Sequence, residues 1–122
     1  MPDSKLRIDE REITGVTVLT LAGEITLDDG DLAFGRRIND LVASGRVKIL
    51  VDLDGVTTID SSGVGMMAAK LKEVRKRGGD IRLLRLSTRN QRMLAVLRLR
   101  TLFEVFDDEA VALRSYDFRP NA

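Results

Sequence analysis

The segment Asp60-Ser61-Ser62-Gly63-Val64-Gly65 holds the side chains of this sequence that are best placed for chemistry. Two hydroxyls follow a carboxylate and precede two glycines, where an apolar strand is expected to give way to a helix. A serine at such a turn can act as a nucleophile, can help to cradle a phosphate, or can itself be phosphorylated. These chemistries need different neighbours, so the rest of the sequence decides among them.

The neighbours of the two serines argue against an enzyme. A nucleophile elbow needs a glycine two residues before the serine and a histidine base. The chain has no His, and neither serine has a glycine two positions before it. A phosphate-binding P-loop needs Gly-Lys-Ser or Gly-Lys-Thr after its glycine-rich turn, whereas Met66 follows Gly65 here. Both enzymatic readings of this turn therefore fail.

Two pairs of carboxylates, Asp28 with Asp29 and Asp52 with Asp54, are the other candidates for acid–base chemistry. They stand at an expected helix start and strand end, where Asp is common for structural reasons. The chain has neither Cys nor His, which removes thiolate chemistry and the commonest metal ligand. The sequence therefore predicts no catalytic residue, no metal site and no cofactor.

The composition indicates one folded domain. A chain of 122 residues can close a single core, and 43% hydrophobic with 32% charged residues supplies both a core and a polar surface. No apolar run approaches the roughly 20 residues of a membrane-spanning helix, and the first residues lack the apolar region of a signal peptide. We expect a cytoplasmic protein, either a monomer or a weak dimer, without a membrane span.

The charges are unevenly distributed along the chain. Residues 1–60 hold seven Lys or Arg and twelve Asp or Glu, whereas residues 61–122 hold thirteen and seven. The basic excess lies between Lys70 and Arg100 and could attract an acidic partner, nucleic acid or an anionic membrane, or could simply be a solvated face. Because aromatic residues that stack on bases are nearly absent from this region, we expect no direct binding of nucleic acid.

Hydrophobic periodicity predicts the elements that must position the serine turn. Val64, Met67, Leu71 and Val74 recur at helical spacing, and Gly78-Gly79 ends that helix. Before this helix, other patterns predict strands near 5–12 and 15–22, a helix from 28–31 to Ser44-Gly45, a strand at 47–53 covered on both faces, and an extended segment at 56–59. After it, they predict a strand at 81–86, a helix capped at Thr88 and a strand at 103–106. A last helix begins at 107–109, with Val111 and Leu113 as its apolar contacts. A hairpin followed by alternating helices and strands predicts an α/β fold.

The two hydroxyls have two non-enzymatic interpretations. Ser61 or Ser62 could accept a backbone N–H and cap the helix, which typically contributes roughly 1 kcal/mol. Alternatively, one serine could be phosphorylated, because a helix N-terminus favours an anion through its dipole and its free N–H groups. A phosphate there would leave the fold intact but would add bulk and charge in front of a docked partner.

The order of these motifs resembles the STAS domain of bacterial anti-sigma factor antagonists. The resemblance rests on Gly23-Glu24-Ile25, the strand at 47–53, the segment Ile59 to Gly65 and the later segment Gly78 to Leu84. It covers about residues 5–115, and we expect residues 1–4 and 117–122 to be flexible. It implies a single mixed β-sheet of four to five strands flanked by about four helices.

The resemblance also implies a function and a set of site residues. The unphosphorylated protein would bind an anti-sigma factor that is also a serine kinase, phosphorylation of Ser61 would release it, and a serine phosphatase would reverse the change. Partner-binding residues would surround Ser61, with Asp60 shaping the turn, Ser62 and Gly63 keeping it tight, and Gly65 and Met66 beginning the docking helix. Many relatives carry Asp where this chain has Thr26, so the usual acidic group is missing or displaced toward Asp28.

Two other roles remain open for a domain of this kind. One is an accessory subunit of a membrane complex, such as a lipid-transport ATPase, which would use the basic region for docking on an acidic subunit or near anionic lipid. The other is a scaffold component of a larger signalling assembly. Neither role would require Ser61 to be switched.

Overall fold

The computed structural model describes residues 4–117. In chain order the elements are β1 (Leu6–Ile13), β2 (Val16–Ile25), α1 (Gly30–Ala43), β3 (Lys48–Ile59), α2 (Ser61–Lys76), β4 (Asp80–Leu84), α3 (Thr88–Val96), β5 (Val105–Phe106) and α4 (Glu109–Ser115). The strands form one sheet in the order β1-β2-β3-β4-β5. Only β1 and β2 pair antiparallel, so the sheet is mixed, and the predicted fold class is confirmed.

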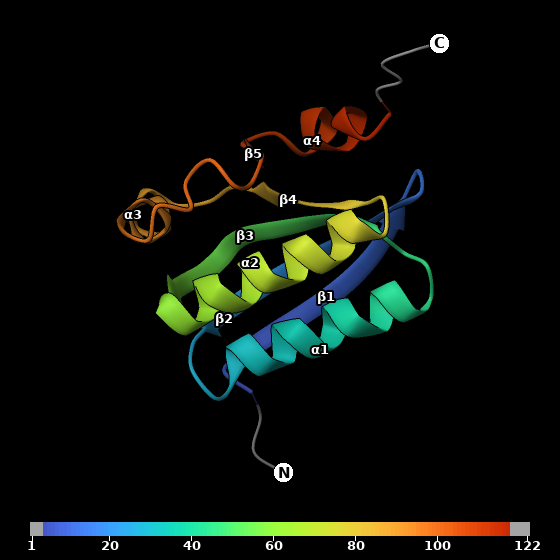
Figure 1. Ribbon diagram of the computed structural model, residues 1–122. Coiled ribbons are helices and arrows are strands. Elements are labelled where there is room, and N and C mark those ends of the chain that lie inside the picture. Colours follow the sequence, from blue (N-terminus) through green and yellow to red (C-terminus); the bar gives the residue numbers. More distant parts are fainter. Residues whose placement is uncertain (1–3, 118–122) are drawn as a thin grey trace.

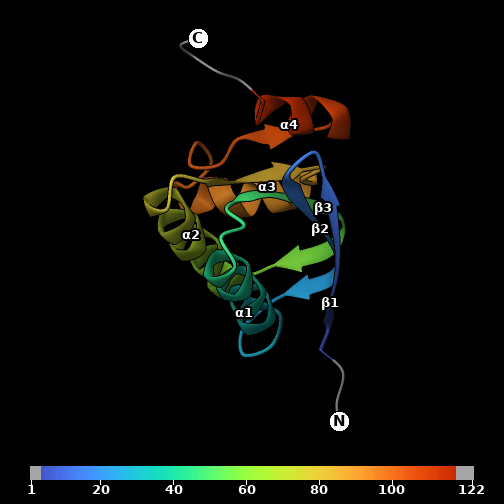
Figure 2. The same cartoon turned by 90° about the vertical axis from the view of Figure 1, so that its right-hand side faces the viewer.

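The helices lie on both sides of this sheet (Figures 1 and 2). The long helices α1 and α2 run side by side over one face, while α4 lies over the opposite side near the last strands. α3 stands at the end of the sheet toward which β3 runs, near the N-terminus of α2. The serine turn therefore lies at that end, between the β2–α1 loop and α3.

Side-chain alternation along β3 divides the core into two parts, as expected for a strand covered on both faces. Ile49, Val51 and Leu53 point into the larger cluster under α1 and α2, whereas Leu50 joins a smaller cluster under α4. The predicted stripe of α2 is confirmed, because Val64, Met67, Leu71 and Val74 are fully buried.

The smaller cluster is anchored by Tyr116, which follows α4 directly. Its hydroxyl lies 2.6 Å from the Ile49 carbonyl and 2.8 Å from the Asp80 carbonyl, so one phenol joins the end of the chain to two strands. Burial is the main cause that raises the pKa of Tyr116. The C-terminal helix is thus held by a neutral, hydrogen-bonded phenol and by small apolar contacts.

The predicted extended segment at 56–59 is confirmed as the last part of β3, which continues through Gly55, where a register shift in the pairing with β2 absorbs the irregularity. Two local predictions were wrong. The cap of α3 is Ser87 and not Thr88, since the Ser87 hydroxyl accepts from the Asn90 N–H at 3.1 Å. In α4, Leu113 packs on the smaller cluster as predicted, but the fully buried residue is Ala112, whereas Val111 is 44% exposed.

Most of the predicted flexible ends, residues 1–3 and 118–122, lie outside the described residues. Within the described part, Ser4 donates a hydrogen bond to Asp29 at 2.7 Å. Between residues 4 and 117, no helix combines the length and apolar character that crossing a membrane requires.

Candidate functional site

The serine turn is held in place by the carboxylate of Asp60, the N-cap residue of α2. One carboxylate oxygen accepts from the Gly63 N–H at 2.8 Å, and the other accepts from the Leu27 N–H at 3.0 Å. The first bond satisfies a helix N-terminal donor, and the second joins the helix to the β2–α1 loop. One side chain therefore fixes both backbone segments that border Ser61.

The turn also packs directly against the end of β2. The Asp60 N–H donates to the Ile25 carbonyl at 3.3 Å. A Cβ added to Gly63 would lie 2.1 Å from the same carbonyl oxygen, a separation that no side chain tolerates. Gly63 is thus required by close backbone contact and not by an unusual backbone angle.

Neither serine caps the helix, which corrects one of the two interpretations of their hydroxyls. Ser61 is exposed and Ser62 is half-buried, and neither side chain makes a hydrogen bond to any residue between 4 and 117. Asp60 takes the capping role one residue earlier, because its side chain accepts from Gly63 and its carbonyl from the Val64 N–H. The Ser61 hydroxyl is consequently free at the first position of the helix.

Two predicted partner-binding residues lie within the helix and not at its beginning. α2 begins at Ser61, so Gly65 and Met66 belong to its second turn. Gly65 is exposed, and an added Cβ would meet nothing within 4 Å. Met66 is half-buried, and its sulfur lies so close to Gly35 of α1 that a Cβ there would approach it to 2.8 Å. Gly65 faces solvent, whereas Met66 helps α1 and α2 to pack closely.

Thr26 begins the loop that faces the serine turn. Its carbonyl accepts from the N–H groups of Asp29 and Asp31 at 3.4 and 3.1 Å, so this residue organises the loop through its backbone. Asp28 is the exposed acid of this loop and has a φ of 64°. Asp29 serves the fold instead, since hydrogen bonds from the Lys5 N–H and the Ser4 hydroxyl hold the pKa of its carboxyl below the ordinary value.

Two exposed leucines border the site and were not predicted from the sequence. Leu27 is 62% exposed, and its backbone is the one that Asp60 holds. Leu32 in the first turn of α1 is 40% exposed. The available signal was a pair of large apolar residues in the acidic segment from Thr26 to Leu32, where a solvated surface needs none. The loop that Asp60 holds against the turn therefore exposes apolar surface suited to protein contact.

The remaining chemical candidates are explained by structure. Asp52 and Asp54 lie within β3 and not at a strand end, and Asp52 is buried, pairs with Arg85 at 2.9 Å, and accepts from the Asp54 N–H, so its carboxylate serves the fold. The described residues contain no cluster of three or more His, Cys, Asp or Glu that could hold a metal ion. What the turn offers chemically is a hydroxyl that can accept a phosphoryl group.

Solved structures with the same fold include anti-sigma factor antagonists. An anti-sigma factor antagonist from Mycobacterium paratuberculosis is 21% identical, with 93% of this chain and 95% of that chain covered and a TM-score of 0.81. The anti-sigma factor antagonist SpoIIAA in its unphosphorylated form is 20% identical, with 94% and 100% covered and a TM-score of 0.78. The phosphorylated form of SpoIIAA from Bacillus is 20% identical, with 90% of this chain and 99% of that chain covered and a TM-score of 0.70.

The same fold also forms a segment of a much larger protein. The murine anion transporter Slc26a9 is 18% identical, with 88% of this chain but 18% of the transporter covered and a TM-score of 0.72. No curated protein sequence matches the chain. At these identities the solved structures establish the fold and leave the function to other arguments.

The sequence itself provides the family assignment. Residues 7–112 match the STAS domain family, which is most of the chain. The five-stranded mixed sheet with four helices agrees with that match, as does the likeness to SpoIIAA. The protein belongs to the STAS domain family.

Proposed function

We propose that this protein is an anti-sigma factor antagonist that acts by partner switching. In its unphosphorylated form it binds an anti-sigma factor with serine kinase activity and thereby frees a sigma factor. Phosphorylation of Ser61 releases it from that partner, and a serine phosphatase restores binding. It works as a cytoplasmic regulator and not as an enzyme.

The observation that carries this proposal is the free hydroxyl of Ser61. The helix is capped by Asp60, and the close contact of the turn is made by Gly63, so Ser61 has no structural task in the described residues. The hydroxyl of a phosphorylation site must be accessible to the kinase, and the fold must not need that hydroxyl for a hydrogen bond of its own. Ser61 meets that requirement, and Ser62, which is half-buried, meets it less well.

A phosphate on Ser61 would change the surface more than the fold. It adds about 1.5 to 2 negative charges and three acceptor oxygens. The N–H groups of Ser61 and Ser62 at the start of the helix have no hydrogen-bond acceptor between residues 4 and 117, and they can receive an anion. A partner that packs on Leu27 and Leu32 would instead meet a hydrated dianion, which opposes docking.

The likeness to SpoIIAA supports this proposal, since that antagonist exists in both an unphosphorylated and a phosphorylated form. The experiment uses the purified chain and the serine-kinase anti-sigma factor encoded nearest to it. Binding is measured by calorimetry for the wild type, Ser61→Ala, Ser61→Asp and the matched control Ser62→Asp. We expect wild type and Ser61→Ala to bind alike and Ser61→Asp to bind at least about tenfold more weakly. Equal affinity of Ser61→Ala and Ser61→Asp would refute the switch.

A second function is favoured by the arginines that accompany α3. Arg89, Arg92, Arg98 and Arg100 form no ion pair with any acid in the part of the chain that the structure covers. Such a basic surface would suit a subunit that docks on an acidic component of a membrane transport complex. Copurification with a permease and an ATPase that persists in Ser61→Asp would support this role, and loss of the complex in Ser61→Asp would argue against it.

A further inference from the structure

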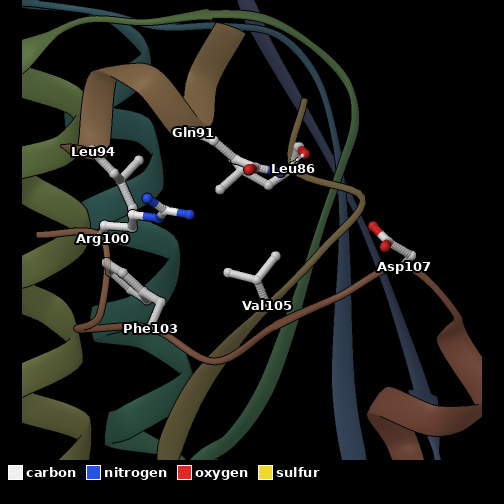
Figure 3. A pocket seen from close by; sticks show the side chains of 7 residues that line it. All are labelled: Leu86, Gln91, Leu94, Arg100, Phe103, Val105 and Asp107. Atoms are coloured by element: carbon white, nitrogen blue, oxygen red, sulfur yellow. Dashed lines mark hydrogen bonds between the residues drawn. The ribbon is translucent and has the colours of Figure 1, made fainter. Parts of the chain in front are cut away.

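A cavity of about 280 Å³ opens between α3 and the segment that leads into β5 (Figure 3). Much of its wall is apolar. Leu86, Leu94 and Phe103 are almost fully buried members of the main core, and Val105 is 39% exposed. These four side chains come from the β4–α3 connection, from α3, and from β5 with the segment before it, so the cavity lies where three parts of the chain meet and is not a groove along one of them.

Arg100 is the cation of this cavity. Its guanidinium points into the open space from the side of Phe103 (Figure 3). Asp107 stands on the opposite side of the opening, and no ion pair joins the two in the structure (Figure 3). Gln91 already donates its amide N–H to the Leu86 carbonyl at 3.0 Å. Arg100 therefore supplies the five donors of a guanidinium to a partly apolar space, without a carboxylate to receive them.

A smaller hollow of about 160 Å³ adjoins the cavity and shares two of its lining residues, Gln91 and Arg100. Arg92 lines this hollow as well. Arg100, which lines both hollows, is exposed, whereas Leu86, Leu94 and Phe103 are almost fully buried. The cavity therefore has a charged side near solvent and an apolar side within the protein.

Small-molecule sites are usually apolar pockets with a few polar groups that fix orientation. A volume of 280 Å³ is about nine times the roughly 30 Å³ that one water molecule occupies in the liquid. That space is too small for a nucleotide but fits a medium-length carboxylate. An anion is favoured over a neutral ligand because Arg100, which is exposed, has no ion-pair partner among residues 4–117 and points its guanidinium into the opening, where it can form a charge-assisted hydrogen bond (Figure 3).

We propose that this cavity binds a small amphiphilic carboxylate of about nine or ten non-hydrogen atoms. Its apolar body packs on Leu94 and Phe103, and its carboxylate pairs with Arg100 at the mouth. This site is independent of Ser61, and its occupancy does not require the proposed partner switch.

The test is a titration of the full isotope-labelled chain followed by amide chemical shifts. Octanoate is the probe, octanol is the neutral match of nearly the same size, and acetate carries the charge alone. We expect saturable shifts at residues 86–107 with octanoate, affinity about tenfold weaker with octanol, and no saturation with acetate. Shifts spread over the whole sheet, or no saturation with octanoate, would overturn the proposal.

Three variants locate the site. Arg100→Gln removes the charge and should weaken octanoate binding about tenfold, whereas Arg89→Gln, in α3 and outside the lining of the cavity and of the hollow, should change it less than about twofold. Val105→Phe fills the space and should abolish binding while leaving the amide spectrum of a folded protein. Equal losses in Arg100→Gln and Arg89→Gln would mean non-specific attraction and would refute the assignment.

Discussion

Two strand-to-helix turns in this molecule carry a serine, and they use it in opposite ways. At the start of α3, Ser87 is the cap, and its hydroxyl accepts from the Asn90 N–H at 3.1 Å. At the start of α2, Asp60 is the cap, and Ser61 follows as the first helical residue with a free, exposed hydroxyl. A shift of one residue relative to the helix start therefore separates a structural serine from one available for modification.

The comparison teaches that residue type alone does not assign a role at a helix start. Ser and Asp are both good caps, so Asp60-Ser61-Ser62 offers three candidates for one task. Asp60 is selected because its second carboxylate oxygen also reaches Leu27 in a loop 33 residues earlier in the chain. A serine has only one side-chain oxygen and would leave that N–H without its acceptor.

Gly63→Ala should cause the largest loss of stability at the Ser61 turn. The new methyl group would collide with the Ile25 carbonyl, so we expect the free energy of unfolding to fall by about 3 kcal/mol. Chemical denaturation measures this directly. Gly65→Ala is the matched control in the same helix, where the space is open and alanine should stabilise the protein by up to about 1 kcal/mol. Similar effects of both substitutions would contradict the described packing.

Asp60→Ala should lower the free energy of unfolding by about 2 kcal/mol, since it removes both the cap and the link to Leu27. Asp60→Asn retains one acceptor oxygen and should cost about half as much. Denaturation midpoints of the two variants decide the point. If both variants are as stable as the wild type, Asp60 does not hold the turn, and the conclusion that Ser61 has no structural role is contradicted.

Replacing each of the two serines should change the free energy of unfolding by less than the Asp60 variants do. Ser87→Ala should lower the free energy of unfolding by about 1 kcal/mol, because a capping hydroxyl is lost. Ser61→Ala should change it by less than about 0.5 kcal/mol, as is usual for an exposed side chain without partners. Parallel urea titrations provide the measurement. A reversal of the two effects would show that Ser61 is the structural serine.

A pH dependence at the neighbouring loop is the smallest expected effect. The pKa of Asp29 lies below its ordinary value because the Lys5 N–H and the Ser4 hydroxyl bond to its carboxylate. This stabilisation is fully present above about pH 4, the pKa of an unfolded Asp, and disappears as pH falls through the lower folded pKa. Asp29→Asn should therefore lose less stability than the wild type on acidification. A greater loss in Asp29→Asn would contradict the assigned direction.

Much of the fold could be predicted from periodicity, because period-2 and period-3.6 patterns report which faces are buried. The stripe of α2 and the two-sided burial of β3 are examples. The extended segment at 56–59 was predicted too, whereas the register shift near Gly55 could not be, since it depends on the pairing with β2. The burial of Ala112 in place of Val111 also follows from tertiary contact, because in α4 the small residue faces the sheet.

The candidate site was located from its motif, but its internal roles were not. Its turn lies where the sequence placed it, between an apolar strand and a helix. The assignment of the cap required the distance from Asp60 to Leu27, and the requirement for Gly63 came from its approach to Ile25. Both are contacts between segments far apart in the sequence. Local patterns carry no information about such contacts.

The central claim is that phosphate on Ser61 changes the binding surface and not the fold. The most direct measurement compares the wild-type chain before and after complete phosphorylation by its anti-sigma kinase, with the phosphosite mapped and both forms titrated against that kinase. We expect one phosphate on Ser61, affinity reduced about a hundredfold, and a free energy of unfolding changed by less than about 1 kcal/mol. Phosphate at another residue, or unchanged affinity with Ser61 fully phosphorylated, would contradict it.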